Sequence, residues 1–260
     1  VKALENVPGV ARIDVSGRGH LGGGRSGIGE TAHAVGFAAG AQRGTGGSHG
    51  GVGGKFSGSG ASVSTPVYGD PKRPNRLGAG GGAWSGNGGD GGGFVRIVAT
   101  DRLVVDGAIR ANGALSSGSA SGEGAGGSVW IDTERLAGTG AISADGGTTD
   151  NGNHTAGGGG RVALYAAFVD PNADLGGLRN VTARGGDGFY DDGAAGTVFL
   201  HVTGDVDGTL LGYVANLAHH VDVGGGAPAS IGAFQEVFQE GVIIPPVKVV
   251  KGGRILDDVF

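Results

Sequence analysis

The five residues Ile142-Ser143-Ala144-Asp145-Gly146 decide the fold, because the chain repeats their pattern four times. The pattern is a β-branched residue, a spacer, a small apolar residue, a second spacer and a glycine. The other copies occupy residues 13–17, 109–113 and 181–185. Apolar residues at every second position are typical of a strand with one buried face, so each copy predicts a short strand that ends in a turn.

A second strand-like element precedes the last three copies and recurs once after them. It occupies residues 94–97, 128–131, 161–164 and 197–200, and its central valines lie 34, 33 and 36 residues apart. A fixed period of this length is typical of stacked repeats. The residues expected on the buried face are Val95, Ile97, Leu103, Val105, Ile109 and Ala111 in the first repeat, Val129, Ile131, Leu136, Ile142 and Ala144 in the second, and Val162, Leu164, Val181 and Ala183 in the third.

Glycine is the other dominant feature, with 63 Gly and 8 Pro among 260 residues. Such a composition without a period would predict disorder, but 38% of the residues are hydrophobic and they concentrate in the repeats. Extended glycine segments can adopt polyproline II geometry and pair side by side, because no Cβ atom separates them. The sequence therefore predicts an all-β fold: a parallel β-solenoid or β-helix-like stack with long polyglycine II segments and little helix.

Three regions follow from these patterns. Residues 1–93 hold an N-terminal strand and a glycine-rich region, residues 94–211 hold the repeats, and residues 212–260 differ from both. In the last region, 227–240 has weak helical spacing, and 242–250 is β-prone but broken by two prolines. Prolines confine a strand to a sheet edge, so this region is expected either to cap the stack or to donate a strand to a neighbouring molecule.

Charge and residue usage exclude several classes of protein. A net charge of −5 does not favour binding to nucleic acid or anionic membranes, and the absence of cysteine excludes disulfides and thiol catalysis. No apolar run approaches the length needed to span a bilayer. Because the chain opens on Val1 and lacks Met, we expect a processed product or a part of a longer polypeptide. Its repeats, rich in Gly and Asp, favour an extracellular or cell-surface location.

The order of the glycine-rich motifs carries a resemblance to a known family. The motifs are residues 48–54, 68–70, 77–82, 126–131, 138–147 and 157–165. In this order they resemble the glycine-rich repeat region of large secreted or cell-surface proteins, over about residues 10–211. The resemblance implies a surface or extracellular setting and supplies no catalytic residue. Residues 212–260 depart from it.

Few residues suggest chemistry. Ser48 lies in a Gly-x-Ser-x-Gly motif, but a match is expected by chance at this glycine content, and no strand-to-helix turn is predicted there. Asp187, Asp191 and Asp192 share one connector, and Asp145 and Asp150 lie in the equivalent one; they either bind Ca²⁺ or form turns, and turns are the preferred interpretation. His219-His220 has no third metal ligand in view. No catalytic, cofactor or metal residue is assigned.

Exposed charges and aromatic residues leave alternatives open. A polysaccharide-cleaving enzyme would need acids and bases on one exposed face, and the candidates are Arg96, Asp106, Arg110, Asp132, Glu134 and Arg135. Sugars or a neighbouring subunit could stack on aromatic residues, and the candidates are Trp84, Trp130, Phe189, Tyr190 and Phe199. Ordinary solvated charges are the preferred interpretation of the first set, and structural packing is the preferred interpretation of most of the second.

The function predicted from the sequence is that of a non-catalytic extracellular structural protein without a cofactor. It would be a filament or sheath subunit or a stalk, and it would bind copies of itself through residues 212–260 and the ends of the solenoid. The alternative is a surface adhesin that recognises glycans. A polysaccharide-cleaving enzyme and an ice-binding protein are weaker alternatives.

Overall fold

The computed structural model describes residues 11–24, 29, 31–34, 40–56, 65–117, 120–149, 154–169, 180–203, 250–251 and 254–255. The chain divides into two compact units, Val1–Leu217 and Ala218–Phe260. The described residues of the second unit form the antiparallel pair β9 (Val250–Lys251) and β10 (Arg254–Ile255). Most of the predicted C-terminal cap or donated strand therefore lies outside the described residues.

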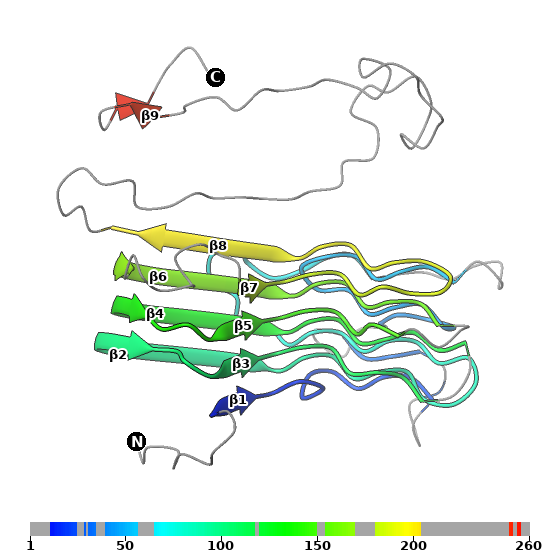
Figure 1. Ribbon diagram of the computed structural model, residues 1–260. Helices are drawn as coiled ribbons and strands as arrows, with labels where there is room; N and C mark the ends of the chain where they lie inside the picture. Colours follow the sequence, from blue (N-terminus) through cyan, green and yellow to red (C-terminus); the bar gives the residue numbers. More distant parts are fainter. Residues whose placement is uncertain are drawn as a thin grey trace, which may run out of the picture. The chain divides into compact units, whose positions relative to one another are not determined.

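Two four-stranded parallel sheets form the first unit. One sheet has the order β1 (Arg12–Asp14), β3 (Ala108–Arg110), β5 (Ala141–Ser143) and β7 (Val181–Thr182). The other has the order β2 (Phe94–Val104), β4 (Ser128–Ala137), β6 (Arg161–Val169) and β8 (Thr197–Val202). Figure 1 shows the strands of each sheet lying one above another, with the connectors extending from them in layers.

This arrangement corrects the predicted fold class. The sequence predicted one parallel β-solenoid stack with polyglycine II segments, whereas the structure has two separate parallel sheets between which the strands alternate along the chain. The period of the repeats places equivalent strands next to one another, short beside short and long beside long, but it does not tell how many sheets the strands form. All-parallel sheets are usual in α/β proteins, where helices cover them. The described residues contain no helix, and glycine-rich segments lie beside the sheets instead.

The register aligns equivalent residues of successive repeats. Ile13, Ile109, Ile142 and Val181 lie side by side in the sheet of short strands. In the sheet of long strands, one row of inward residues runs from Val95 to Val198. The inner faces of both sheets share one hydrophobic core, which confirms the buried face predicted from the alternation, with Ile97 and Leu103 only partly covered. Burial of these aliphatic side chains is the main stabilising contribution that the sequence provides.

The glycine-rich segments pack against one another through their backbones. Gly89 N donates to Gly122 O over 2.9 Å, and Gly126 N donates to Gly158 O over 2.9 Å. A segment from the N-terminal region joins them, since Gly47 N donates to Glu123 O and Gly158 N donates to Gly47 O. A Cβ atom at Gly124 would overlap the carbonyl oxygen of Asp90, so glycine is required there for the chains to approach. These hydrogen bonds satisfy buried backbone groups that would otherwise lack partners.

Candidate functional site

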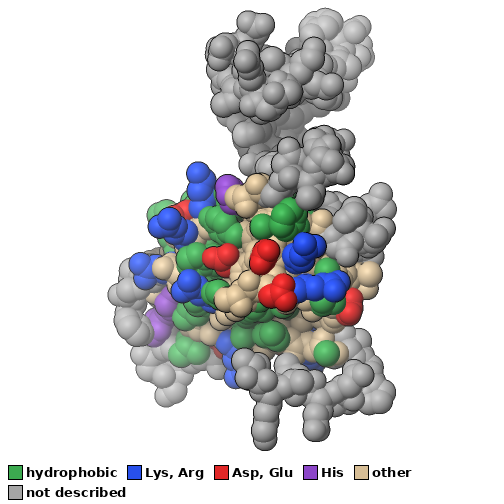
Figure 2. Space-filling view, turned by 90° about the vertical axis from the view of Figure 1, so that its left-hand side faces the viewer, with side chains coloured by type: hydrophobic (Ala, Val, Ile, Leu, Met, Phe, Trp, Pro, Cys, Tyr) green, Lys and Arg blue, Asp and Glu red, His purple; other side chains and the backbone are tan. Residues whose placement is uncertain are grey.

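A groove of about 460 Å³ crosses the outer face of the sheet of long strands. Each strand presents alternate side chains to this face, so the groove is built from matching positions of four repeats. Figure 2 looks onto the ends of the sheets, where acidic and basic side chains lie among hydrophobic ones. The residues that line the groove are Val98, Ala99, Thr100, Asp132, Thr133, Glu134, Tyr165, Ala166, Ala167, His201 and Thr203.

The parallel register fixes the order of polar groups across the groove. Asp132 of β4 pairs with Tyr165 of β6, which pairs with His201 of β8. The Tyr165 and His201 ring centroids are 5.5 Å apart, and the Tyr165 hydroxyl donates to the Lys72 carbonyl oxygen over 2.7 Å. Glu134 lies two residues beyond Asp132 on the same face, and both carboxylates are exposed. The groove therefore combines two acids, an anchored phenol and an exposed imidazole.

Three other aromatic rings of this sheet make cation–π contacts with Lys or Arg side chains of the protein. The Arg96 guanidinium lies 4.4 Å from the Trp130 ring centroid, and Lys72 Nζ lies 5.8 Å from that of Phe199. The Arg135 guanidinium lies 5.1 Å from the Phe168 ring centroid. Of the charges and aromatics that the sequence singled out, Arg96, Arg135, Trp130 and Phe199 are therefore paired within the protein, while Asp132 and Glu134 face the groove.

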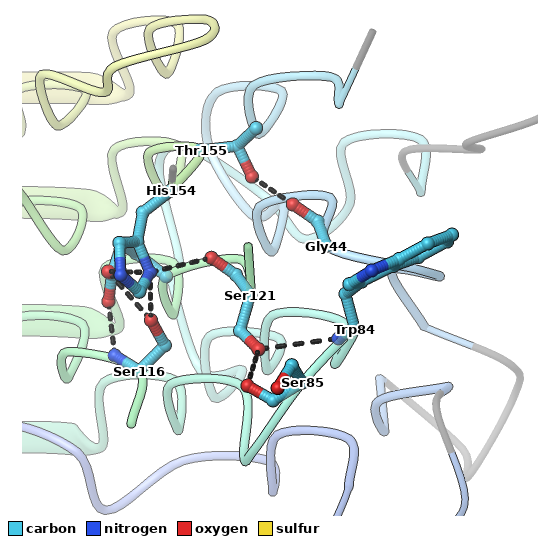
Figure 3. A network of polar contacts seen from close by, with 8 residues as sticks. Gly44, Trp84, Ser85, Ser116, Ser121, His154 and Thr155 are labelled. Atoms are coloured by element: carbon cyan, nitrogen blue, oxygen red, sulfur yellow. Dashed lines mark hydrogen bonds and ion pairs between the residues drawn. The ribbon is translucent and has the colours of Figure 1, made fainter. Parts of the chain in front are cut away.

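A second polar cluster lies among the glycine-rich connectors and consists of Ser116, Ser121, Glu123 and His154. Figure 3 shows Ser116, Ser121 and His154 of this cluster pointing toward one another. Glu123 is 1% exposed and accepts hydrogen bonds from the Ser116 backbone N–H and, over 2.9 Å, from the Ser116 hydroxyl. His154 Nδ1 lies 2.8 Å from Ser116 Oγ, 3.1 Å from the Ser121 carbonyl oxygen and 3.6 Å from Glu123 Oε1. Burial raises the pKa of the Glu123 carboxyl, and the Ser116 hydrogen bonds and His154 partly oppose this.

This cluster has the residue types of a serine hydrolase triad but a different geometry. In a triad, one imidazole nitrogen accepts the serine proton while the other donates to the acid. Here a single nitrogen, His154 Nδ1, faces the serine, the acid and a carbonyl oxygen that can only accept. Nδ1 therefore carries the proton, and it does not act as a base toward Ser116. The cluster links successive connectors, and it gives no support for a nucleophilic serine.

The Gly-x-Ser-x-Gly motif places Ser48 and His49 in the packed interior. Ser48 Oγ accepts from Gly53 N over 3.0 Å, and His49 Nδ1 donates to Gly126 O over 2.8 Å. His49 is fully buried, and its Nε2 has no hydrogen-bond partner among the described residues. Burial, the largest cause, and the nearby Arg161 guanidinium lower the pKa of His49 to about 4 despite its bond to Gly126. Both residues therefore hold glycine-rich segments together.

The aspartates of the connectors accept hydrogen bonds from the chain. Asp191 Oδ2 accepts from Lys55 N, Asp192 Oδ1 accepts from Gly188 N, and Asp145 accepts from Thr182 Oγ1 and Arg184 N. The backbone N–H of Asp187 donates to Thr148 Oγ1 over 3.2 Å. Across the described ranges, no group of three or more His, Cys, Asp or Glu side chains is placed to hold a metal ion. Asp150 and the pair His219-His220 lie outside those ranges.

The remaining aromatic candidates meet near the connector ends. Trp84 and Tyr190 both contact Phe56, with ring centroids 5.7 and 4.8 Å apart, and Phe189 packs edge-on against Tyr190. Trp84 and Phe189 keep large exposed surfaces. These contacts account for part of the aromatic surface by packing within the chain.

Four residues of the groove and of the polar cluster were not predicted from the sequence: Tyr165, His201, Glu123 and His154. Tyr165 and His201 each lie three positions after the central valine of a repeat, as Asp132 does, so aligning the repeats places all three in one row. Glu123 and His154 carried a weaker signal, a lone acid and a lone imidazole within runs of glycine. Their meeting depends on how the connectors stack, which no local pattern reveals.

Comparison with known proteins gives short matches. The family model described as Hydantoinase B/oxoprolinase matches residues 197–260. An uncharacterised protein of Methanocaldococcus jannaschii is 57% identical over 47 residues, 18% of this chain and 8% of that protein. The 5-oxoprolinase PfmaA of Pestalotiopsis fici is 41% identical over 54 residues, 20% of this chain and 4% of that protein. No solved structure matches the chain, and no helix among the described residues is long and apolar enough to cross a membrane.

These matches overturn three expectations. The resemblance to glycine-rich regions of surface proteins is wrong as an assignment, because the matches are to hydantoinase B/oxoprolinase and a 5-oxoprolinase. The predictions of a non-catalytic filament, sheath, stalk or adhesin and of a chain that is not an enzyme are wrong for the same reason. The glycine content and the repeats, on which these predictions were based, describe the scaffold. The family match instead begins at β8 and extends through the region interpreted as a cap. Three expectations stay predictions: binding to further copies of the chain, binding to glycans, and an extracellular setting. The comparisons establish similarity to hydantoinase B/oxoprolinase over residues 197–260 and to a 5-oxoprolinase over 54 residues.

Proposed function

We propose that this chain takes part in the hydrolysis of a cyclic amide of the hydantoin or 5-oxoproline kind. The observation that carries the proposal is the match of residues 197–260 to hydantoinase B/oxoprolinase. The 5-oxoprolinase PfmaA supports it with 41% identity over 54 residues. The match to PfmaA covers 4% of that protein. The proposal therefore concerns the class of reaction and does not name any other chain that takes part in it.

The reaction sets requirements that residues in the matched segment can meet. Water must attack the ring carbonyl, the resulting oxyanion must be stabilised, and the departing nitrogen must gain a proton. Imidazole suits such proton transfers because its pKa lies near neutral pH. The histidines of the matched segment are His201, on β8, and the pair His219-His220. We assign the proton transfers to the pair, because two adjacent imidazoles can serve in turn as proton acceptor and proton donor.

The test is a turnover assay on the full chain with hydantoin and with 5-oxoproline, each with and without magnesium ATP. A phosphoryl donor is included because opening an unstrained five-membered lactam can require coupling to a favourable reaction. The products, N-carbamoylglycine and glutamate, are measured by mass spectrometry. We expect release of at least one product, and loss of at least 100-fold in rate when His219 and His220 are both replaced by Gln.

The matched control is Asp187→Asn, a change of an exposed residue outside the matched segment. It should keep the rate of the unmodified chain. Equal rates for the double His variant and the unmodified chain would show that His219 and His220 of the matched segment do not take part in the reaction. No product from either ring would contradict the proposal itself.

A further inference from the structure

We infer that the groove on the outer face of the sheet of long strands binds an organic cation, a guanidinium group on an aliphatic chain. The cation would lie between Asp132 and Glu134 and against the Tyr165 ring. The proposed cation binding does not depend on the proposed hydrolysis, and its test measures binding without turnover.

The charge of the groove selects the sign of the ligand. Its acidic lining residues are Asp132 and Glu134, and neither Lys nor Arg is among the residues that line it. His201 lies at the far end of the row that starts at Val98. An anion such as a free carboxylate would meet two like charges, whereas a cation would meet two opposite ones.

The spacing of the two acids favours a planar, multidentate cation. Residues two apart on one strand face the same side about 7 Å apart, so a group between them can donate to both carboxylates. Guanidinium presents five N–H donors in a fixed plane and pairs with carboxylates through two hydrogen bonds at once. A compact ammonium group would reach one carboxylate well and the other poorly.

The aromatic pattern of the sheet supplies the second, independent observation. Trp130, Phe168 and Phe199 each hold a cation from the chain over the ring. Among the described residues, no such cation contact involves Tyr165, the aromatic residue that lines the groove. Its ring is held in place because its hydroxyl donates to Lys72 O. Phe199 and His201 of β8 lie beside the Tyr165 ring, each with its centroid 5.5 Å away, so a cation from solution would contact this ring from the side of Asp132 on β4.

The groove has the volume for such a ligand. About 460 Å³ lies within the range of small-molecule sites in proteins. The four strands across it span about 14 Å, three spacings of 4.8 Å, so an aliphatic chain can extend along the groove from the guanidinium. Ala167, a small residue that lines the groove, leaves room for that chain.

The experiment is a titration of the full chain with agmatine, a guanidinium on an aliphatic chain, followed by calorimetry at low salt. We expect saturable binding of one agmatine per chain, weakened at least tenfold in the variant that combines Asp132→Asn with Glu134→Gln. The matched control Asp187→Asn removes one exposed carboxylate elsewhere and should leave the affinity unchanged. Raising NaCl from 20 to 300 mM should weaken binding, since the pairs are exposed.

A second pair of variants tests the ring separately from the charge. Tyr165→Phe keeps the ring and should retain binding within about twofold, whereas Tyr165→Leu should weaken it several-fold. Unfolding curves of each variant confirm that it folds. Absence of saturable agmatine binding, equal affinity in the doubly neutralised variant, or tighter binding of 5-oxoproline than of agmatine would each overturn the inference.

Discussion

Acidification provides a sharp test of how the glycine-rich segments are held, through the buried imidazole of His49. Its Nδ1 donates to Gly126 O while its Nε2 lies without a partner among the described residues. Burial lowers the pKa of His49 to about 4 from an ordinary 6.5. Protonation would place a charge in a fully buried position beside Arg161, so the folded protein resists it.

The sign follows from proton binding in the two states. Between pH 6.5 and about 4 the unfolded chain binds a proton at His49 and the folded protein does not. The free energy of unfolding therefore has its full His49 contribution above pH 6.5 and loses it as the pH falls toward 4. A difference of about 2.5 pKa units at 1.36 kcal/mol each corresponds to about 3 kcal/mol.

The assay is urea unfolding at pH 7.5 and pH 4.0, followed by tryptophan fluorescence, for the unmodified chain and for His49→Asn. Asparagine keeps an N–H donor toward Gly126 O but does not titrate. Other groups titrate equally in both chains, so the difference between their pH-dependent losses isolates His49. We expect the unmodified chain to lose about 3 kcal/mol more than the variant. Equal losses in the two chains would refute the buried placement of His49.

Three further predictions concern the glycine-rich segments, the polar cluster and the core. Gly124→Ala should cost about 3 kcal/mol or more of unfolding free energy in thermal melts, because its Cβ overlaps Asp90 O; an unchanged melting temperature would count against the close approach. Burial raises the pKa of Glu123, so the folded protein should lose stability as the pH rises through and above about 4.5. Glu123→Gln should remove this loss. Identical pH profiles of the two chains in urea unfolding would contradict the burial of the acid. Ile142→Ala should cost about 2–5 kcal/mol, whereas exposed Val98→Ala should cost under about 1 kcal/mol, and equal costs in chemical denaturation would disprove the core assignment.

Local sequence patterns predict the strands and their registers but not the sheets. The alternation around Ile109 and Ile142 predicts two short strands with the same buried face, and the structure pairs these residues directly. The period of the repeats indicates that equivalent strands are neighbours, but it does not tell how many sheets they form. The number of sheets depends on connector paths across some 30 residues, so the predicted solenoid stack differs from the two sheets observed.

The glycine-rich packing is harder to predict for a related reason. Gly47 bonds to Glu123 and receives a bond from Gly158, although these residues are far apart in sequence. Contacts between backbones leave no side-chain pattern, so composition indicates close packing without indicating partners. The same limit hides the meeting of Ser116, Glu123 and His154.

The sequence alone predicts some of the residues that line the candidate groove. Asp132 and Glu134 stand out as charges on alternate positions of one strand, but Tyr165 and His201 become partners only after the repeats are aligned. The function was harder to predict from the sequence than the groove. The β-prone run 242–250 suggests a cap on physical grounds alone, and its place in a hydantoinase/oxoprolinase match depends on comparison with other proteins.

The most direct measurement of the proposed activity is oxygen transfer from water. The full chain is incubated in H₂¹⁸O with hydantoin or 5-oxoproline, and the ring-opened product is analysed by mass spectrometry. The proposal predicts product that carries at least one ¹⁸O in its new carboxylate, and this signal should vanish when His219 and His220 are replaced by Gln. Intact rings without ¹⁸O-labelled product, in the presence and absence of magnesium ATP, would contradict it.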